Sequence, residues 1–331
     1  MTRSDLTRRQ AIAGIAGVAG IWAGPGSRPA GAQTAVTLQL SWLHSVQFAG
    51  SYIARHNGWW RDAGLEVALA PGGPNAPVEP PVVSGTALVG ISAADYTAAA
   101  VSQGAPFRII GVAMQKNPFV IASLPANPVR NPADLVGKRL GMAIANTPVL
   151  EALCTLNGID VAGIEIVPTQ YSAAPLLAGQ VDCLLCWETD LPVAMAVQGV
   201  ESETMLMADH GYALHSQTYI ATEESLAERR DDLVALMSGE VRGWERYRED
   251  TDAAAALTVE LFPDAGLDLE TQELQAERQV PLMFSELTER NGFGWWTDDA
   301  VAANIETLRL LGHDVSPALW DRTILEEVHE S

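Results

Sequence analysis

Aromatic and polar side chains recur where predicted strands end. Trp42 directly follows the first strand, and Asp95 and Tyr96 follow a later one. In open α/β sheets ligands bind beyond the carboxyl ends of the strands, so such positions should line one cleft. An indole offers a flat face to a ring, and a carboxylate accepts hydrogen bonds from amino groups. The predicted ligand-binding residues are Trp42, Gln47, Phe48, Asp95, Tyr96, Asn146, Thr147, Trp187 and Glu188.

Each of these roles competes with an ordinary structural one. Trp42 could instead pack under the first helix. Gln47 and Phe48 lie in the first turn of that helix. Gln47 could form hydrogen bonds with the ligand and Phe48 could line the site, or both could be packing residues of the helix. Glu188 is either aimed at amino groups of a ligand ring or a solvated loop acid. Asp95 either contacts ligand or N-caps the helix that begins next to it.

The charge of the predicted site segments favours an amine-bearing ligand. Residues 41–54, 90–98, 145–150 and 186–190 contain three acids and no Lys or Arg. A sulfonate, nitrate or phosphate usually requires a guanidinium or several dipoles, whereas a neutral or cationic amine-bearing ring suits carboxylates. Thr147, the predicted N-cap before a proline, should add free backbone N–H groups for a carbonyl or an anion.

Metal, redox and catalytic chemistry find little support in the residues. Cys183 and Cys186 lack a second Cys or His pair nearby, as a zinc site would require, and a strand would point their thiols to opposite faces. We therefore expect buried apolar cysteines. Of the six scattered histidines, His44 alone lies beside a predicted site segment. We expect no cofactor, no metal and no catalytic residue.

Two runs of alternating strands and helices should position the site residues. Strands are expected at 36–40, 65–70, 87–92, 138–143, 164–167 and 181–186. Helices are expected over 45–56, from Ser172 to Gly179, and from Thr297 to a final end near Gly312. The helical pattern after Tyr219 should cover the first lobe.

The predicted fold class is α/β, with two doubly wound lobes joined by a two-strand hinge. Lobe 1 should comprise residues 34–121 and 218–331, and lobe 2 residues 122–217. The chain would then cross between the lobes near Ala122 and near Gln217, and such a double crossover is a natural hinge.

The first residues are typical of an export signal. Residues 7–10 (TRRQ) form a twin-arginine region, residues 11–24 an apolar run, and residues 30–32 (AGA) a cleavage site, so residues 1–32 are a predicted signal peptide. Without these residues, which hold four Arg and one Asp, the formal charge changes from −21 to −24. Such acidity disfavours nucleic acid and anionic membranes. We expect a free periplasmic protein, exported by the twin-arginine route.

Four segments resemble periplasmic binding proteins of the thiamine-pyrimidine-precursor and alkanesulfonate type. They are WLHSVQFAGSYIARHNGWWRDAGL at 42–65, NPADLVGKRLGM at 131–142, PLLAGQVDCLLCWETDLP at 175–192 and RGWERYREDTDAA at 242–254. The resemblance implies a type-II periplasmic binding fold, with the ligand held between the lobes and passed to an ABC permease in the inner membrane. It also supports a ligand-contacting role for Glu188.

A eukaryotic branch of this group is instead a pyrimidine synthase that carries pyridoxal phosphate on a lysine. The corresponding stretch here, residues 90–96, has no lysine, and the whole chain has only Lys116 and Lys138. That chemistry therefore lacks its Schiff-base amine. We expect a non-enzymatic, monomeric binder of a small nitrogenous aromatic such as a thiamine-precursor aminopyrimidine. Alternatives are a riboflavin or other heterocycle binder, a sulfonate or nitrate binder, and an enzyme of pyrimidine biosynthesis on the same fold.

Overall fold

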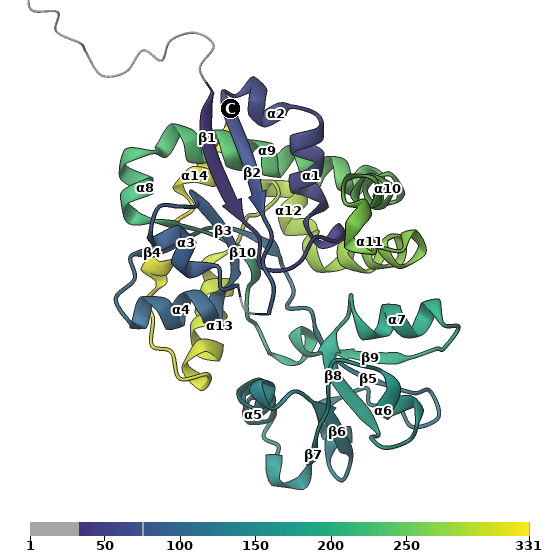
Figure 1. Cartoon of the computed structure of the whole chain (residues 1–331). Helices are drawn as coiled ribbons and strands as arrows, with labels where there is room; N and C mark the ends of the chain where they lie inside the picture. Colours follow the sequence, from purple (N-terminus) through teal and green to yellow (C-terminus); the bar gives the residue numbers. More distant parts are fainter. Residues whose placement is uncertain (1–32, 75, 331) are drawn as a thin grey trace, which may run out of the picture. The chain divides into compact units, whose positions relative to one another are not determined.

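Two five-stranded sheets organise the protein in this computed structural model, which describes residues 33–74 and 76–330 (Figure 1). The first sheet has the order β2-β1-β3-β10-β4, and the second has the order β7-β6-β8-β5-β9. The strands of the first sheet are β1 (Thr34–Gln39), β2 (Leu65–Ala70), β3 (Val89–Ala93), β4 (Phe107–Met114) and β10 (Ser216–Thr222). Those of the second are β5 (Phe119–Ser123), β6 (Arg139–Met142), β7 (Glu165–Pro168), β8 (Cys183–Trp187) and β9 (Glu203–Leu206).

Both sheets are mixed, which the strand-and-helix pattern did not predict. In the first, β1 pairs in parallel with β2 and β3, whereas β10 is antiparallel to β3 and β4. In the second, β6 pairs in parallel with β7 and β8, whereas β5 is antiparallel to β8 and β9. The predicted α/β fold is confirmed, with one antiparallel strand inserted into each sheet.

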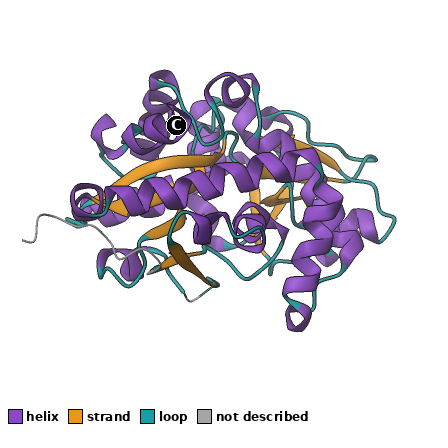
Figure 2. Ribbon diagram, turned by 90° about the horizontal axis from the view of Figure 1, so that it is seen from above, coloured by secondary structure: helices purple, strands orange, loops and turns teal. Residues whose placement is uncertain are grey.

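Helices flank the strands (Figure 2). Between strands of the first sheet lie α1 (Ala49–His56), α2 (Trp59–Asp62), α3 (Glu79–Val83) and α4 (Ala94–Ser102). Between strands of the second lie α5 (Thr147–Leu156), α6 (Ala174–Leu177) and α7 (Leu191–Val197). After β10 come α8 (Glu223–Glu228), α9 (Arg230–Glu249), α10 (Thr251–Leu261), α11 (Leu269–Met283), α12 (Glu286–Asn291), α13 (Asp298–Leu310) and α14 (Thr323–Glu330).

Two of the helices after β10 pack against elements of the first sheet. Helix α9 packs against α1 and β2, and α14 packs against α9 and β4. The indole Nε1 of Trp60 donates a hydrogen bond of 2.9 Å to the carbonyl of Leu236 and so ties α2 to α9. The predicted last helix is α13, and it is followed by α14, so Gly312 does not end the final helix.

Alternate residues of β8 pack into different apolar clusters. Cys183 and Leu185 belong to the larger cluster, and Leu184 and Cys186 to a smaller one. This is the two-faced alternation of a strand with both faces covered. The buried, free cysteines are therefore core residues, as predicted. The thiol of Cys183 is an inert one, because burial raises its pKa to about 12.

The first crossing between the sheets comes earlier than predicted. The chain leaves the first sheet after Met114 and enters the second at Phe119, so Ala122 lies inside β5 rather than at a crossing. The return lies between Leu206 and Ser216, just before the predicted Gln217. The predicted boundary failed because β4 and β5 form one nearly continuous apolar run, interrupted by residues 115–118.

The predicted signal peptide, residues 1–32, lies outside the described residues. Within residues 33–74 and 76–330, no helix combines the length and apolar character that crossing a bilayer demands.

Candidate functional site

Large aromatic side chains are exposed just beyond the carboxyl ends of parallel strands. Trp42 follows β1 and is 45% exposed, and Tyr96 follows β3 and is 67% exposed. In the second sheet, Tyr171 follows β7 and is 60% exposed. Rings of this size usually bury most of their surface, so flat apolar faces at these positions are available to a ligand. Tyr171 was missing from the predicted site, although it follows a predicted strand.

Aromatic contacts link the second sheet to the segment through which the chain returns to the first sheet. Trp187, at the end of β8, meets Phe119 edge to face with ring centroids 6.1 Å apart. Phe119 in turn meets Tyr212 edge to face at 6.3 Å. Burial raises the pKa of the Tyr212 hydroxyl, and the charges of Asp95 and Tyr96 add to this shift. Trp187, Phe119 and Tyr212 therefore form a row of edge-to-face ring contacts, and neither Phe119 nor Tyr212 was among the predicted site residues.

Asp95 lies in the first turn of α4 and is not its N-cap, which is Ala93. The predicted capping role is therefore wrong. Its Oδ1 is buried and has no hydrogen-bond partner among the described residues. Burial raises the pKa of this carboxyl, and backbone hydrogen bonds partly oppose the rise. A buried carboxyl oxygen without a partner is suited to accept a hydrogen bond from a ligand.

Glu188 forms an ion pair with Arg278 of α11, at 2.6 Å between Oε1 and Nη1. It is thus not a solvated loop acid. The other oxygen, Oε2, is buried without a partner in the described part of the chain. The predicted site segments contain no arginine, but α11 brings the guanidinium of Arg278 to Glu188 from outside them. A guanidinium beside a carboxylate allows the site to hold an anionic group as well as an amine.

Helix α11 also contacts the segment that follows β1. Gln272 accepts a hydrogen bond of 2.7 Å from the backbone N–H of Val46. Because Gln272 and Arg278 lie less than two turns apart, α11 bridges the segments around Gln47 and Glu188. A buried stripe of Gln272, Gln275 and Gln279 at helical spacing was the only local signal of this polar helix face.

A cavity of about 190 Å³ opens at the carboxyl ends of β6 and β7. It is lined by Met142, Ala143, Asn146, Thr169, Gln170, Tyr171, Leu184, Leu185 and Leu191. The hydroxyl of Tyr171 donates a hydrogen bond of 2.5 Å to Asp190. Burial raises the pKa of Asp190, and this hydrogen bond acts in the opposite direction. Asn146 thus lines a mainly apolar recess with a polar rim, built from segments of the second sheet.

The burial of Phe48 and Gln47 fits the packing alternative, and the predicted N-cap role of Thr147 is wrong. Phe48 is fully buried in the core, and Gln47 is almost so. The helix predicted over 45–56 is split into a 3₁₀ turn, Val46–Phe48, and α1, which rotates these side chains inward. Thr147 is the first residue of α5 and not its N-cap, and its hydroxyl donates to the carbonyl of Ile144 at 2.7 Å.

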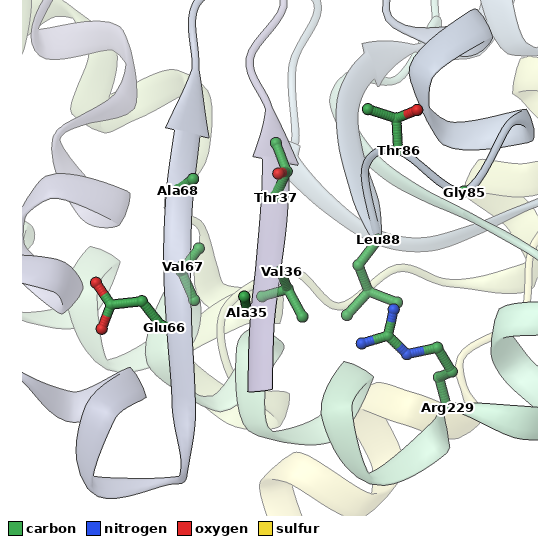
Figure 3. Close-up of a pocket in the computed structure, with 10 residues that line it drawn as sticks. All are labelled: Ala35, Val36, Thr37, Glu66, Val67, Ala68, Gly85, Thr86, Leu88 and Arg229. Carbon is green, nitrogen blue, oxygen red and sulfur yellow. The ribbon is translucent and has the colours of Figure 1, made fainter. Parts of the chain in front are cut away.

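A second cavity, of about 250 Å³, lies along β1 and β2 (Figure 3). It is lined by Ala35, Val36, Thr37, Glu66, Val67, Ala68, Gly85, Thr86, Leu88 and Arg229. Arg229 pairs with Asp232 at 2.9 Å, and Figure 3 shows Glu66 pointing away from it. None of the predicted site residues lines this cavity. Within the described residues, no group of three His, Cys, Asp or Glu side chains is placed to hold a metal ion.

Residues 45–254 match the family model described as NMT1/THI5 like. The chain belongs to the NMT1/THI5-like family. The matched range contains eight of the nine predicted site residues and excludes Trp42 and Arg278, so neither of these two is covered by the family match.

Two curated relatives are named as binding proteins. The riboflavin-binding protein RibY of Chloroflexus aurantiacus is 26% identical over 84% of this chain and 81% of its own length. The formylaminopyrimidine-binding protein of Halalkalibacterium halodurans is 21% identical over 78% of this chain and 79% of its own. A 4-amino-5-hydroxymethyl-2-methylpyrimidine phosphate synthase of Legionella pneumophila is 27% identical over a shorter part, 41% of each chain.

The fold is that of a periplasmic binding protein. The periplasmic aliphatic sulphonate binding protein SsuA from Escherichia coli superposes with a TM-score of 0.62 at 15% identity, covering 85% of this chain and 92% of its own. The predicted type-II binding fold of this NMT1/THI5-like chain is thereby confirmed. The same fold also serves an enzyme, the desulfurization enzyme DSZB, with a TM-score of 0.58 at 16% identity.

Proposed function

We propose that this chain is the solute-binding component of an ABC importer and that it holds a small, flat, nitrogenous ring beyond the carboxyl ends of its two sheets. The observation that carries the proposal is the exposure of Trp42, Tyr96 and Tyr171 at three such strand ends. Acidic side chains accompany them, with partnerless buried oxygens on Asp95 and Glu188. Aromatic faces would hold the ring, and carboxylates would accept hydrogen bonds from its amino groups.

Binding works, in this proposal, by closure of two lobes built on the two sheets. The crossing segments at 115–118 and 207–215 would serve as the hinge, and the lobes would contribute aromatic residues from opposite sides. The binding-protein names of the two relatives with the longest alignments support a transport role without catalysis. Lys116, one of the two lysines, forms an ion pair with Asp209 at 2.7 Å. It lies outside residues 90–96, the stretch that corresponds to the pyridoxal-phosphate lysine of the synthase branch.

Isothermal titration of the purified protein with riboflavin, a formylaminopyrimidine and taurine tests the proposal. We expect one of the two heterocycles to bind with a dissociation constant of about 1 µM or below. Closure should also lower the radius of gyration measured by X-ray scattering. Trp42→Ala should weaken binding about tenfold or more through the lost ring contact. Val136→Ala, which truncates an exposed apolar side chain away from the strand ends, is the matched control.

Turnover of either heterocycle would refute a purely binding role, and tight binding of taurine alone would refute the ring-binding proposal. A second candidate, an organic sulfonate, is favoured by one observation, the guanidinium of Arg278 beside Glu188. If the sulfonate is the ligand, Arg278→Met should abolish taurine binding, because the charge-assisted hydrogen bond is lost. If the ligand is a heterocycle, taurine should fail to bind the unaltered protein as well.

We further propose that residues 1–32 direct export to the periplasm through the twin-arginine route. The support is the Arg8-Arg9 pair ahead of an apolar run. Replacing both arginines by lysine keeps the charge and should leave the chain in the cytoplasm, with its signal uncleaved. Cell fractionation with detection of the chain measures this. Unchanged periplasmic delivery of the double variant would show that another route exports it.

A further inference from the structure

Gln217 combines a strained backbone with an unsatisfied side chain at the start of β10. Among the described residues it is the only non-glycine residue with a positive φ, at +47°. For a residue with a Cβ atom, this left-handed conformation is strained, because Cβ crowds the following carbonyl oxygen. The pairing of β10 with β3 also shifts register between Ser216 and Thr218, which places Gln217 in an irregular, bulged position. Strained residues and bulges of this kind concentrate at functional sites.

The carboxamide of Gln217 is buried without a partner. The residue is 2% exposed, and neither its Nε2 nor its Oε1 has a hydrogen-bond partner among the described residues. A buried amide with both atoms unsatisfied is expensive, so a glutamine would be a poor choice for packing alone. Its two atoms offer one donor group and one acceptor side by side.

Backbone contacts bring the start of β10 to the first turn of α4, which carries another unsatisfied polar group. The carbonyl of His215 accepts a hydrogen bond of 3.1 Å from the backbone N–H of Ala94, and Ser216 lies opposite Ala93. The start of β10 is therefore fixed against the first turn of α4, which carries Asp95 and its partnerless Oδ1. Tyr212 lies three residues before His215 in the second crossing segment, and its buried hydroxyl also has no partner within the described chain.

We propose that Gln217, Asp95 and Tyr212 form a polar subsite at the hinge that reads the amidine- or amide-type edge of the bound ring. A side-chain carboxamide can pair with an amino donor and an adjacent ring nitrogen simultaneously, as in the recognition of adenine by glutamine. The free oxygen of Asp95 accepts from the ring's amino or imide N–H, and the Tyr212 hydroxyl donates to a ring nitrogen or carbonyl. Aminopyrimidines and the imide edge of riboflavin both present such paired groups, whereas an alkanesulfonate does not.

This subsite rests on the proposed heterocycle-binding function and deepens it by naming the part of the ligand that is recognised. It also gives the hinge a direct ligand contact, because Tyr212 lies in the second crossing segment and Gln217 follows it. Ligand binding and lobe closure would then be coupled through the same residues.

The test compares two Gln217 variants in titrations with riboflavin and a formylaminopyrimidine. Gln217→Glu keeps the shape and one acceptor but removes the amide donor, and Gln217→Gly removes the side chain while relieving the positive φ. Both should weaken binding of whichever heterocycle binds the unaltered protein by about tenfold or more, the equivalent of one lost hydrogen bond. Gln217→Gly should nevertheless keep or raise the urea midpoint, because the strain and the unsatisfied amide are gone.

Tyr212→Phe, which removes only the hydroxyl, should weaken heterocycle binding without lowering the urea midpoint. Gln198→Glu makes the same amide-to-acid change on an exposed part of the helix after β8 and should leave binding unchanged. Unaltered affinity in both Gln217 variants, or a loss of stability with no loss of affinity, would overturn the subsite while leaving the proposed function intact. Failure of the unaltered protein to bind either heterocycle would overturn both.

Discussion

The unaltered protein should lose stability as the pH rises from about 4.5 to above 7, whereas the Glu240→Gln variant should not. The difference in unfolding free energy between the variant and the unaltered protein should therefore change by about 3 kcal/mol in favour of the variant. Glu240 is fully buried, and burial raises its pKa from 4.5 to about 7. Hydrogen bonds from Tyr219, at 2.6 Å, and Trp244, at 3.2 Å, stabilise the carboxylate but do not offset the burial.

The sign follows from proton binding. Because the folded pKa exceeds the unfolded one, the folded state holds the proton over the window between them. The stability that this proton contributes is fully present below the unfolded value and is lost as the pH rises through the folded value. Glutamine resembles the protonated acid and does not titrate, so the two proteins should match best at low pH and diverge as the pH rises.

Urea denaturation of both proteins at several pH values measures this divergence. His215 contributes in the opposite direction, because burial lowers its pKa to about 4 and its neutral form favours folding above that value. That contribution is common to both proteins and disappears in the difference. Glu245→Gln, an exposed acid on the same helix, is the control and should give a nearly flat difference. A constant offset for Glu240→Gln across the range would contradict the buried, protonated carboxyl.

Local patterns predicted the individual strands and helices better than their arrangement. The strand predicted over 65–70 is β2, residue for residue, because it alternates buried and exposed side chains. The antiparallel insertion of β10 and β5 could not be predicted in this way. Strand order depends on which segments meet after long excursions of the chain, and a periodicity of two carries no information about the partner.

For the site, too, the sequence pattern points to residues next to predicted strands but not to residues that come from distant parts of the chain. Trp42 and Asn146 were predicted from the rule about carboxyl strand ends, and Trp42 is exposed while Asn146 lines a recess, so their ligand contact stays a prediction. Arg278 escaped prediction because it reaches Glu188 across 90 residues of sequence. The sequence left open whether Phe48 lines the site or packs in the core, and its complete burial beside the 3₁₀ turn at Val46–Phe48 fits the packing role.

Two of the four segments that carry the family resemblance meet in one helix contact between α1 and α9. The segment at 42–65 contains Gly50, and the segment at 242–254 contains Gly243 and Trp244. A Cβ atom added at Gly243 would lie 2.0 Å from the carbonyl oxygen of Gly50, and one added at Gly50 would lie 2.4 Å from the Trp244 ring. Both positions therefore require glycine because two helix backbones and a buried indole approach closely.

Gly243→Ala should destabilise the protein by about 3 kcal/mol. Alanine is the better helix former by about 1 kcal/mol, so propensity alone would predict the opposite sign. The clash should win because the atom in the way belongs to the α1 backbone, which cannot rotate aside as a side chain can. The urea midpoint measures the loss. Gly163→Ala, where the added methyl meets only Val136 at an ordinary 3.4 Å, should change stability by no more than about 0.5 kcal/mol.

The same substitution should also reach the site, because α1 begins directly after the 3₁₀ turn that follows Trp42. An extra methyl group that pushes α1 from α9 shifts this turn and its hydrogen bond to Gln272 of α11. We therefore expect weaker ligand binding in the fraction of Gly243→Ala that remains folded, whereas Gly163→Ala should bind normally. A stable Gly243→Ala protein with unchanged affinity would show that α1 and α9 can separate without moving the segment that carries Trp42.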